Sequence, residues 1–222
     1  MAVQRDLEFG ARAPRSLRLR RESWGFALGS LCFAVGAVPW YAEAVGAVWG
    51  SATFFAGSIL FTLAGLIQLL LSGRRPPYRG ISRADAADWW SAAVQFVGTL
   101  LFNVSTFVVL AAAVAQPDDH MTGWKPDAWG SVAFLVSSAL AMVAAARRHE
   151  LWDGLARTWA GTWLNMLGSI FFGVSAVGAY VLPATGDLVS LAWANLGTFL
   201  GALCFFFAAV LARRNIAPDP RS

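Results

Sequence analysis

Six long apolar blocks, none with an interior charged residue, constrain the fold of this chain more than any other feature. They run over residues 24–42, 48–72, 89–114, 128–146, 159–181 and 189–212. Each block is close to the ~20 residues that a helix needs to cross a bilayer. Lipid offers no partner to an unpaired backbone group, and the blocks lack the alternation of barrel strands. We therefore predict an all-α integral membrane protein with six transmembrane helices.

The basic residues predict how these helices are oriented. If the N-terminal segment is cytoplasmic, sixteen of the seventeen Lys and Arg residues lie on that side and only Lys125 lies on the other. Short loops follow the positive-inside bias, so we expect both termini in the cytoplasm and the protein in a bacterial-type cytoplasmic (inner) membrane. The net charge of +4 then reflects orientation and attraction to anionic lipid at the cytoplasmic face, and no nucleic acid partner is expected.

A near-repetition of sequence predicts the internal organisation. "WGFALGSLCFAVGAV" begins at Trp24, "WLNMLGSIFFGVSAV" begins at Trp163, and a third, more diverged copy aligns Gly98 with Gly29 and Gly168. The helices that follow these copies also resemble one another, so the unit is a pair of helices used three times. All three pairs enter from the same side, which predicts three tandem parallel two-helix repeats in a pseudo-threefold bundle.

The predicted divisions of the chain follow from this unit. They are a basic cytoplasmic segment 1–22, helix pair 23–72, loop 73–88, helix pair 89–146, loop 147–158, helix pair 159–212 and cytoplasmic tail 213–222. Ser82 and Asp85 have the spacing of a capping box that opens the third helix. Leu151, Trp152 and Leu155 lie among charges, which predicts a short helix at the membrane interface.

Small residues recur at equivalent places in the three pairs and predict where helices pack. Such residues let backbones approach closely where lipid offers no hydrophobic drive for association. The odd-numbered helices contribute Gly29, Gly36, Gly98, Ser105, Gly168 and Ser175, and the even-numbered helices contribute Gly57, Ser137, Gly197 and Gly201. Ser137 is matched with Gly57 and Gly201 because Trp49, Trp129 and Trp193 begin segments of similar sequence.

Membrane-embedded activity usually requires an ionisable residue at depth, and the blocks contain none. This weighs against a proton relay, a voltage sensor and a carboxylate-driven carrier. Neutral polar groups remain at Gln95, Asn103 and Asn165. They have two interpretations: hydrogen bonds between helices, or the lining of a small polar site.

The longest outer loop contains Asp118, Asp119, His120, Met121 and Asp127, whose side chains include metal-ligating types. Contiguous residues in a loop rarely build a closed coordination shell, so we interpret this segment as a solvated acidic loop and predict no metal site. No histidine pair lies within the helices, and no phosphate loop, nucleophile elbow or zincin motif is present. We therefore expect no catalytic residue, no cofactor and no enzymatic activity.

The first helix pair carries a pattern of glycine, serine and phenylalanine in "LGSLCFAVGAV…WGSATFFAGSILFTLAG". It resembles the YrhK-like membrane proteins, whose two-helix units have spacing of this kind. The matching residues are Gly29, Ser30, Phe33, Gly36, Phe54, Gly57 and Ser58, with weaker matches at Ser131, Phe134 and Ser138. The family implies no known reaction, cofactor or substrate.

These features favour a non-enzymatic scaffold or accessory protein that packs with a second copy or with another membrane protein. One alternative is a transporter or channel for a small neutral or apolar solute, built on the pseudo-threefold axis, and a weaker one is an enzyme that acts on lipid. A continuous axial cavity lined by Gln95, Asn103 and Asn165 would favour transport. A dry, filled axis would favour the scaffold.

Overall fold

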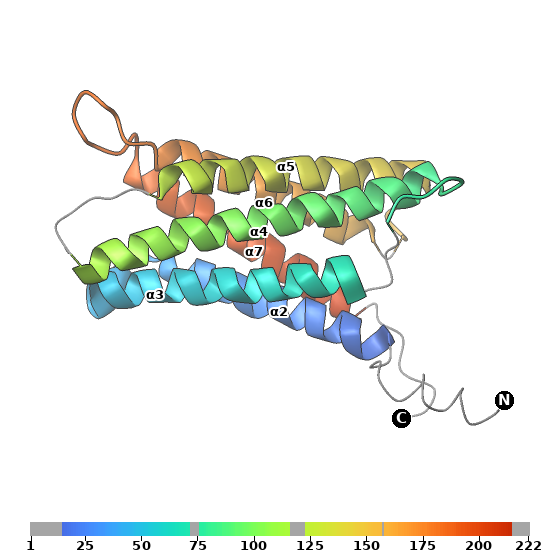
Figure 1. Ribbon diagram of the computed structural model, residues 1–222, viewed down its shortest axis with the longest axis horizontal. Coiled ribbons are helices and arrows are strands. Elements are labelled where there is room, and N and C mark those ends of the chain that lie inside the picture. The colour runs from blue at the N-terminus through green and yellow to red at the C-terminus, as the bar shows by residue number, and fades with distance from the viewer. Residues whose placement is uncertain (1–14, 72–75, 116–122, 157, 215–222) are drawn as a thin grey trace.

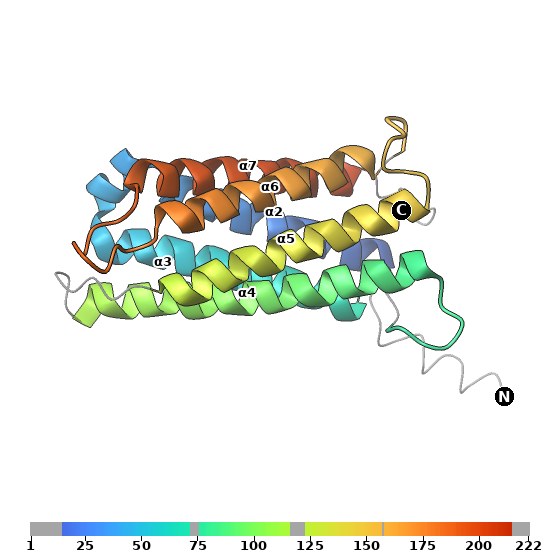
Figure 2. The ribbon, with the colours of Figure 1, turned by 90° about the horizontal axis from the view of Figure 1, so that it is seen from above.

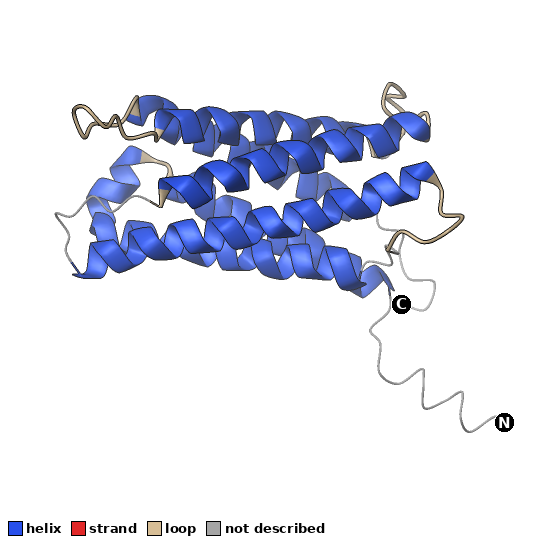
Figure 3. Ribbon diagram, turned by 45° about the horizontal axis from the view of Figure 1, so that its top comes forward, coloured by secondary structure: helices blue, strands red, loops and turns tan. Residues whose placement is uncertain are grey.

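The computed structural model describes residues 15–71, 76–115, 123–156 and 158–214, and all of their regular secondary structure is helical (Figures 1 and 3). The helices are α2 (Arg15–Gly36), α3 (Pro39–Leu66) with its π-helical continuation η1 (Ile67–Leu71), α4 (Arg83–Ala115), α5 (Trp124–Arg147), α6 (Trp159–Gly178) and α7 (Leu191–Arg214). The predicted acidic loop from Asp118 to Met121, and most of segments 1–22 and 213–222, lie outside the described residues.

Five helices among the described residues are long and apolar enough to cross a membrane. They are Pro39–Leu70, Arg83–Ala115, Trp124–Arg147, Trp159–Gly178 and Leu191–Arg213. The described chain is thus that of an all-helical, multi-pass membrane protein. Helix α2 falls short of the same criterion because Arg20, Arg21 and Glu22 precede its apolar run, which ends at Gly36.

The predicted first block, 24–42, is not one helix. Helix α2 ends at Gly36, and Pro39 begins α3 after Val38, whose backbone is extended at φ −83° and ψ 119°. Proline has no N–H to donate to the preceding turn, so it belongs at a helix start and not in a helix interior. A second break follows at Gly46, where φ is 77° and ψ is 171°, a conformation open to glycine and strained for other residues.

The six helices form a closed ring. Each helix packs on the next one along the chain, and α7 packs on α2. Figures 1 and 2 show the helices side by side along the long axis of the molecule, with the first residues of α2 and the last residues of α7 at the same end. The last residues of α2, α4 and α6 and the first residues of α3, α5 and α7 lie at the opposite end, which we call the distal end.

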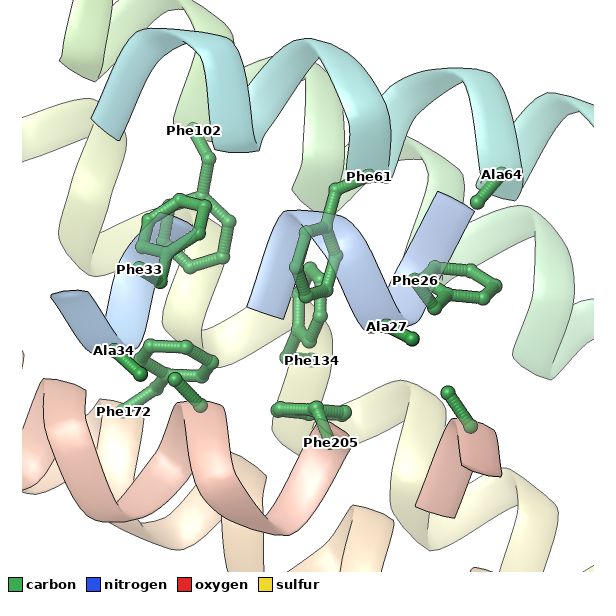
Figure 4. Packing of buried hydrophobic residues seen from close by; sticks show 12 residues of the cluster. Phe26, Ala27, Phe33, Ala34, Phe61, Ala64, Phe102, Phe134, Phe172 and Phe205 are labelled. Atoms are coloured by element: carbon green, nitrogen blue, oxygen red, sulfur yellow. The ribbon is translucent and has the colours of Figure 1, made fainter. Parts of the chain in front are cut away.

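Six phenylalanines fill the middle of this ring (Figure 4). Phe33, Phe102 and Phe172 form one triangle, with ring centroids 5.8 to 6.2 Å apart. A second triangle, of Phe61, Phe134 and Phe205, has centroids 5.5 to 6.2 Å apart. The triangles contact each other at 5.1 to 5.6 Å through the pairs Phe33–Phe61, Phe102–Phe134 and Phe172–Phe205. Contacts of this geometry add to the stabilisation that comes from burial.

Each phenylalanine of the second triangle packs its ring on a glycine of the other helix in the same pair. A β-carbon built on Gly29 would lie 2.6 Å from the Phe61 ring, one on Gly98 would lie 2.7 Å from Phe134, and one on Gly168 would lie 3.0 Å from Phe205. The first triangle has the reciprocal arrangement, with Phe33 on Gly57, Phe102 on Gly130 and Phe172 on Gly201. The helices of each pair therefore approach through reciprocal glycine–phenylalanine contacts.

The residue of α5 in this arrangement is Gly130, and the predicted counterpart, Ser137, does not occupy that place. Ser137 lies two helical turns further along and hydrogen-bonds to Ser91, with Oγ donating to the Ser91 carbonyl at 2.8 Å. Residues seven apart lie on nearly the same face of a helix, so Gly130 and Ser137 both face α4. The alignment based on Trp49, Trp129 and Trp193 therefore predicted the wrong α5 counterpart of Gly57 and Gly201.

Hydroxyl groups join neighbouring helices across the ring. Ser58 Oγ lies 2.9 Å from Thr106 Oγ1 between α3 and α4, and Ser138 Oγ lies 2.8 Å from Ser169 Oγ between α5 and α6. Ser58 and Ser169 are fully buried. A buried hydroxyl without a partner would be costly, so these pairs fix which helix faces meet.

The segments at the end of the bundle opposite the distal end show one confirmed and one wrong prediction. Ser82 caps α4, because its Oγ accepts the Asp85 backbone N–H at 3.0 Å and donates to the Asp85 carboxylate at 2.8 Å. The predicted interfacial helix in 147–158 is wrong, since residues 148–156 form turns and bends. Asp153 accepts the backbone N–H of Leu155 at 3.0 Å, a local bond that competes with helix formation.

Arg148 ties these segments together. Its guanidinium donates to Asp85 at 2.8 Å and lies 3.8 Å from Asp88. Burial lowers the pKa of Arg148, but the hydrogen bond to Asp85 and the charges of Asp88 and Asp85 outweigh it and leave the pKa above its ordinary value. Because both partners are partly solvated, the pair adds little stability and mainly fixes the linker against α4.

Candidate binding vestibule

A cavity enters the bundle from the distal end and stops at the first phenylalanine triangle. Its inner part has a volume of ≈ 210 Å³ and is lined by Phe33, Ser51, Phe54, Phe102, Ser105, Thr106, Val109, Asp127, Phe172, Ser175 and Thr198. Its outer part, of ≈ 610 Å³, shares several of these residues and extends to Trp124, Asn195 and the α6–α7 linker. We call the two parts together the vestibule. The second phenylalanine triangle closes the ring beneath it.

The lining of the inner part differs among the three helix pairs at matching places. Three residues before Gly57, Gly130 and Gly201 stand Phe54, Asp127 and Thr198 respectively. Three residues after the phenylalanines of the first triangle stand Gly36, Ser105 and Ser175.

In the first helix pair these two places are apolar and filled. A β-carbon built on Gly36 would lie only 2.9 Å from the Phe54 ring, so this ring packs directly on the glycine. In the second and third pairs the same places carry a carboxylate and hydroxyls. The vestibule is therefore polar on two sides and aromatic on the third.

Most hydroxyls of the vestibule already have partners. Ser175 Oγ lies 2.7 Å from Thr198 Oγ1 and donates to the Ala194 carbonyl at 2.7 Å. Thr106 Oγ1 donates to the Phe102 carbonyl at 2.7 Å. These bonds fix the hydroxyl oxygens with lone pairs still available to an incoming donor.

Asp127 differs from these hydroxyls. It belongs to the first turn of α5, where its backbone N–H donates to the Gly123 carbonyl at 3.2 Å. Within the described part of the chain, its carboxylate makes no hydrogen bond or ion pair. No Lys, Arg or His among the described residues lines the vestibule. The inner part thus combines one half-buried carboxylate with the rings of four phenylalanines.

The polar residues predicted as a site do not meet in this structure. The Asn103 side-chain N–H donates to Thr62 Oγ1 at 2.7 Å, facing α3. Ser137 Oγ lies 3.5 Å from Gln95 Oε1, facing α5. Asn165 is half-buried, and its backbone carbonyl accepts from Ser169 at 2.9 Å. None of the three lines the vestibule.

The sequence analysis predicts Asp127 in the solvated outer loop, because it borders the apolar block 128–146. The signal that could have revealed it is the register of α5. With Gly130 aligned to Gly57, Asp127 aligns with Phe54, an apolar position next to the core. Ser105 and Ser175, predicted as packing residues, line the vestibule while they pack.

Neither a metal site nor a relative adds to this picture. Within the described ranges, no three His, Cys, Asp or Glu side chains come together in a way that could hold a metal ion. No protein-family model, no curated protein and no solved structure matches the chain. The vestibule must therefore be interpreted from its own chemistry.

Proposed function

We propose that the protein is a non-enzymatic scaffold or accessory protein of the cytoplasmic membrane, with six spanning helices. The observation that carries this proposal is the filled centre of the ring. Six phenylalanine rings contact one another across the axis, so a polar solute meets no continuous path through the described bundle. A closed, well-packed core suits a protein that acts through its own assembly and contacts.

The same proposal treats the helices as three tandem parallel pairs about a pseudo-threefold axis. Support comes from the reciprocal glycine–phenylalanine contacts, which occur once in each pair. The two phenylalanine triangles each take one ring from every pair. Further support comes from the YrhK-like spacing of the first pair, since that resemblance also concerns two-helix units.

For the orientation, we propose that both termini are cytoplasmic. The basic residues Arg21, Arg83, Arg147, Arg148 and Arg213 all belong to the end of the bundle opposite the vestibule. The positive-inside bias assigns that end to the cytoplasm, beside anionic lipid. The vestibule then opens away from the cytoplasm.

Solute flux tests the proposal. The protein would be reconstituted in proteoliposomes, and the shrinkage and swelling of the vesicles in urea and in glycerol would be followed by light scattering. Rates equal to those of protein-free vesicles of the same lipid are expected. A saturable flux that requires the protein would contradict the scaffold.

One observation favours a second candidate, a transporter for a small solute. The vestibule ends blindly at a layer of side chains, as expected for one access state of a protein that alternates between two. For this candidate the phenylalanines act as a gate and must move apart. The flux experiment therefore separates the two candidates.

A further inference from the structure

We propose that the vestibule binds a small organic cation of the alkylammonium class, with Asp127 as its counter-charge. This inference goes beyond the scaffold function and does not depend on it, because a closed bundle and a gated transporter can both hold a ligand at one end. It rests on the charge, the aromatic lining, the size and the asymmetry of the cavity.

The charge of the vestibule selects a cation. Among the residues that the structure describes, Asp127 is the one ionisable residue that lines the inner part, and Asp187 lines the outer part. No described basic side chain lines either part, so the negative charge is not neutralised within the described lining. A carboxylate in a recess with apolar walls attracts a cation more strongly than one in open water.

The aromatic walls select an organic cation over a hydrated ion. Phe33, Phe54, Phe102 and Phe172 all line the inner part. The faces of aromatic rings attract cations, most strongly when the cation sheds its water, and alkylammonium groups do so easily. The combination of a carboxylate and several rings is therefore suited to an alkylated nitrogen.

The size and donor set disfavour a bare metal ion. The inner volume of ≈ 210 Å³ is well above the ~10–15 Å³ that a cavity needs to hold one water. Hard cations such as Ca²⁺ need six to eight oxygen ligands at close range, whereas this lining offers one carboxylate and scattered hydroxyls. Ser105, Ser175 and Thr198 can instead accept hydrogen bonds from an N–H group.

The asymmetry of the cavity points in the same direction. At the place of Asp127, the first helix pair carries Phe54, which packs on Gly36. An apolar residue there is thus compatible with the fold, and a carboxylate is not needed for packing. A half-buried charge at the edge of a membrane bundle is costly, and such residues usually serve a ligand.

The test uses the full chain in nanodiscs and calorimetric titration with trimethylammonium chloride, with sodium chloride in the buffer at constant ionic strength. Saturable binding to the unmodified protein is expected. In the Asp127→Asn variant, the dissociation constant should rise by about tenfold or more, as expected when one partner of a desolvated charge pair is lost. The matched control is Asp153→Asn, which changes an exposed aspartate at the opposite end and should leave the affinity unchanged.

A second variant covers the case in which Asp127→Asn does not fold. Ser51→Phe puts a ring at a place that lines both parts of the vestibule, so it should narrow the cavity and weaken binding with Asp127 intact. The proposal is overturned if the unmodified protein shows no saturable binding, or if both vestibule variants bind as tightly as it does. It is also overturned if sodium or potassium alone gives the same saturable heat, or if tert-butanol, a neutral molecule of similar shape, binds equally well. None of these outcomes bears on the flux experiment.

Discussion

The ring of Phe61 lies so close to Gly29 that a β-carbon on the glycine would come within 2.6 Å of it. The Gly29 carbonyl oxygen would in turn lie 3.1 Å from a β-carbon on Gly57. Helices α2 and α3 thus meet where neither has a side chain, and the ring fills the space left above the contact. Close approach of this kind is how membrane helices gain packing that lipid does not supply.

Gly29→Ala and Gly98→Ala should each destabilise the protein by about 1–3 kcal/mol, since the added methyl must displace a core ring or separate two helices. Thermal or denaturant unfolding of the detergent-purified variants measures the effect. The matched control is Gly161→Ala in α6, where nothing in the described residues other than the surrounding backbone of α6 lies within 4 Å of the added carbon. Equal transitions for Gly29→Ala and Gly161→Ala would show that the backbone contact is not tight.

Phe134→Ala should lower the free energy of unfolding by about 3–5 kcal/mol, because it removes a large side chain from a packed core. Phe134 is 1% exposed and contacts rings of both triangles. The control is Phe207→Ala, which alters a ring that is 52% exposed on the outer surface of α7. The account of the core fails if the two variants unfold alike in the same assay.

The Ser138–Ser169 contact should couple α5 to α6 by about 0.6 kcal/mol, the average for hydrogen bonds between membrane helices. A double-mutant cycle with Ser138→Ala, Ser169→Ala and the combined variant isolates this value from unfolding data. The two hydroxyl oxygens lie 2.8 Å apart, and Ser169 Oγ also lies 3.1 Å from the carbonyl oxygen of Phe134. Strict additivity would mean that the pair contributes no joint stabilisation.

Reporters inserted after Gly154 and after Gly186 should report opposite sides of the membrane, with the Gly154 site in the cytoplasm. The two glycines belong to linkers at opposite ends of the bundle, on either side of α6. The positive-inside bias gives the polarity. Activity that requires the cytoplasm at Gly154 and export at Gly186 is the expected pattern. The same location at both sites would show that α6 does not cross.

The uncharged apolar runs predicted the bounds of α5, α6 and α7 to within about four residues, because in lipid the length of such a run sets the length of the helix. Helix α4 begins well before its run, at Arg83, where Ser82 caps it. The prediction of a single helix over the first block, 24–42, is wrong for a local reason. Pro39 lies inside an uninterrupted apolar run, and hydropathy does not register the missing N–H that ends α2 before it. The predicted interfacial helix in 147–158 is wrong for a similar reason. The hydrogen bond that Asp153 accepts from the Leu155 backbone outweighs the apolar pattern of the segment.

The candidate site was less predictable than the fold. Small residues at helical spacing indicate which face packs, but a shift of seven residues leaves that face almost unchanged. The contacts of Phe102 with Gly130 and of Phe134 with Gly98 fix the register of α5. That register brings Asp127 to the edge of the core, whereas its place in the sequence, just before an apolar block, predicts a solvated loop.

The closure of the ring by α7 against α2 bears on how the protein is made. Helices are delivered to the membrane in chain order, so α2 arrives first and its final neighbour arrives last. Until Leu191 and the residues after it are inserted, the nascent bundle lacks Phe205 from its core and Thr198 from its vestibule. Ribosomal stalling or proteolysis before α7 would leave exposed the face of α2 that otherwise packs on α7, a surface that quality-control proteases and neighbouring membrane helices can engage.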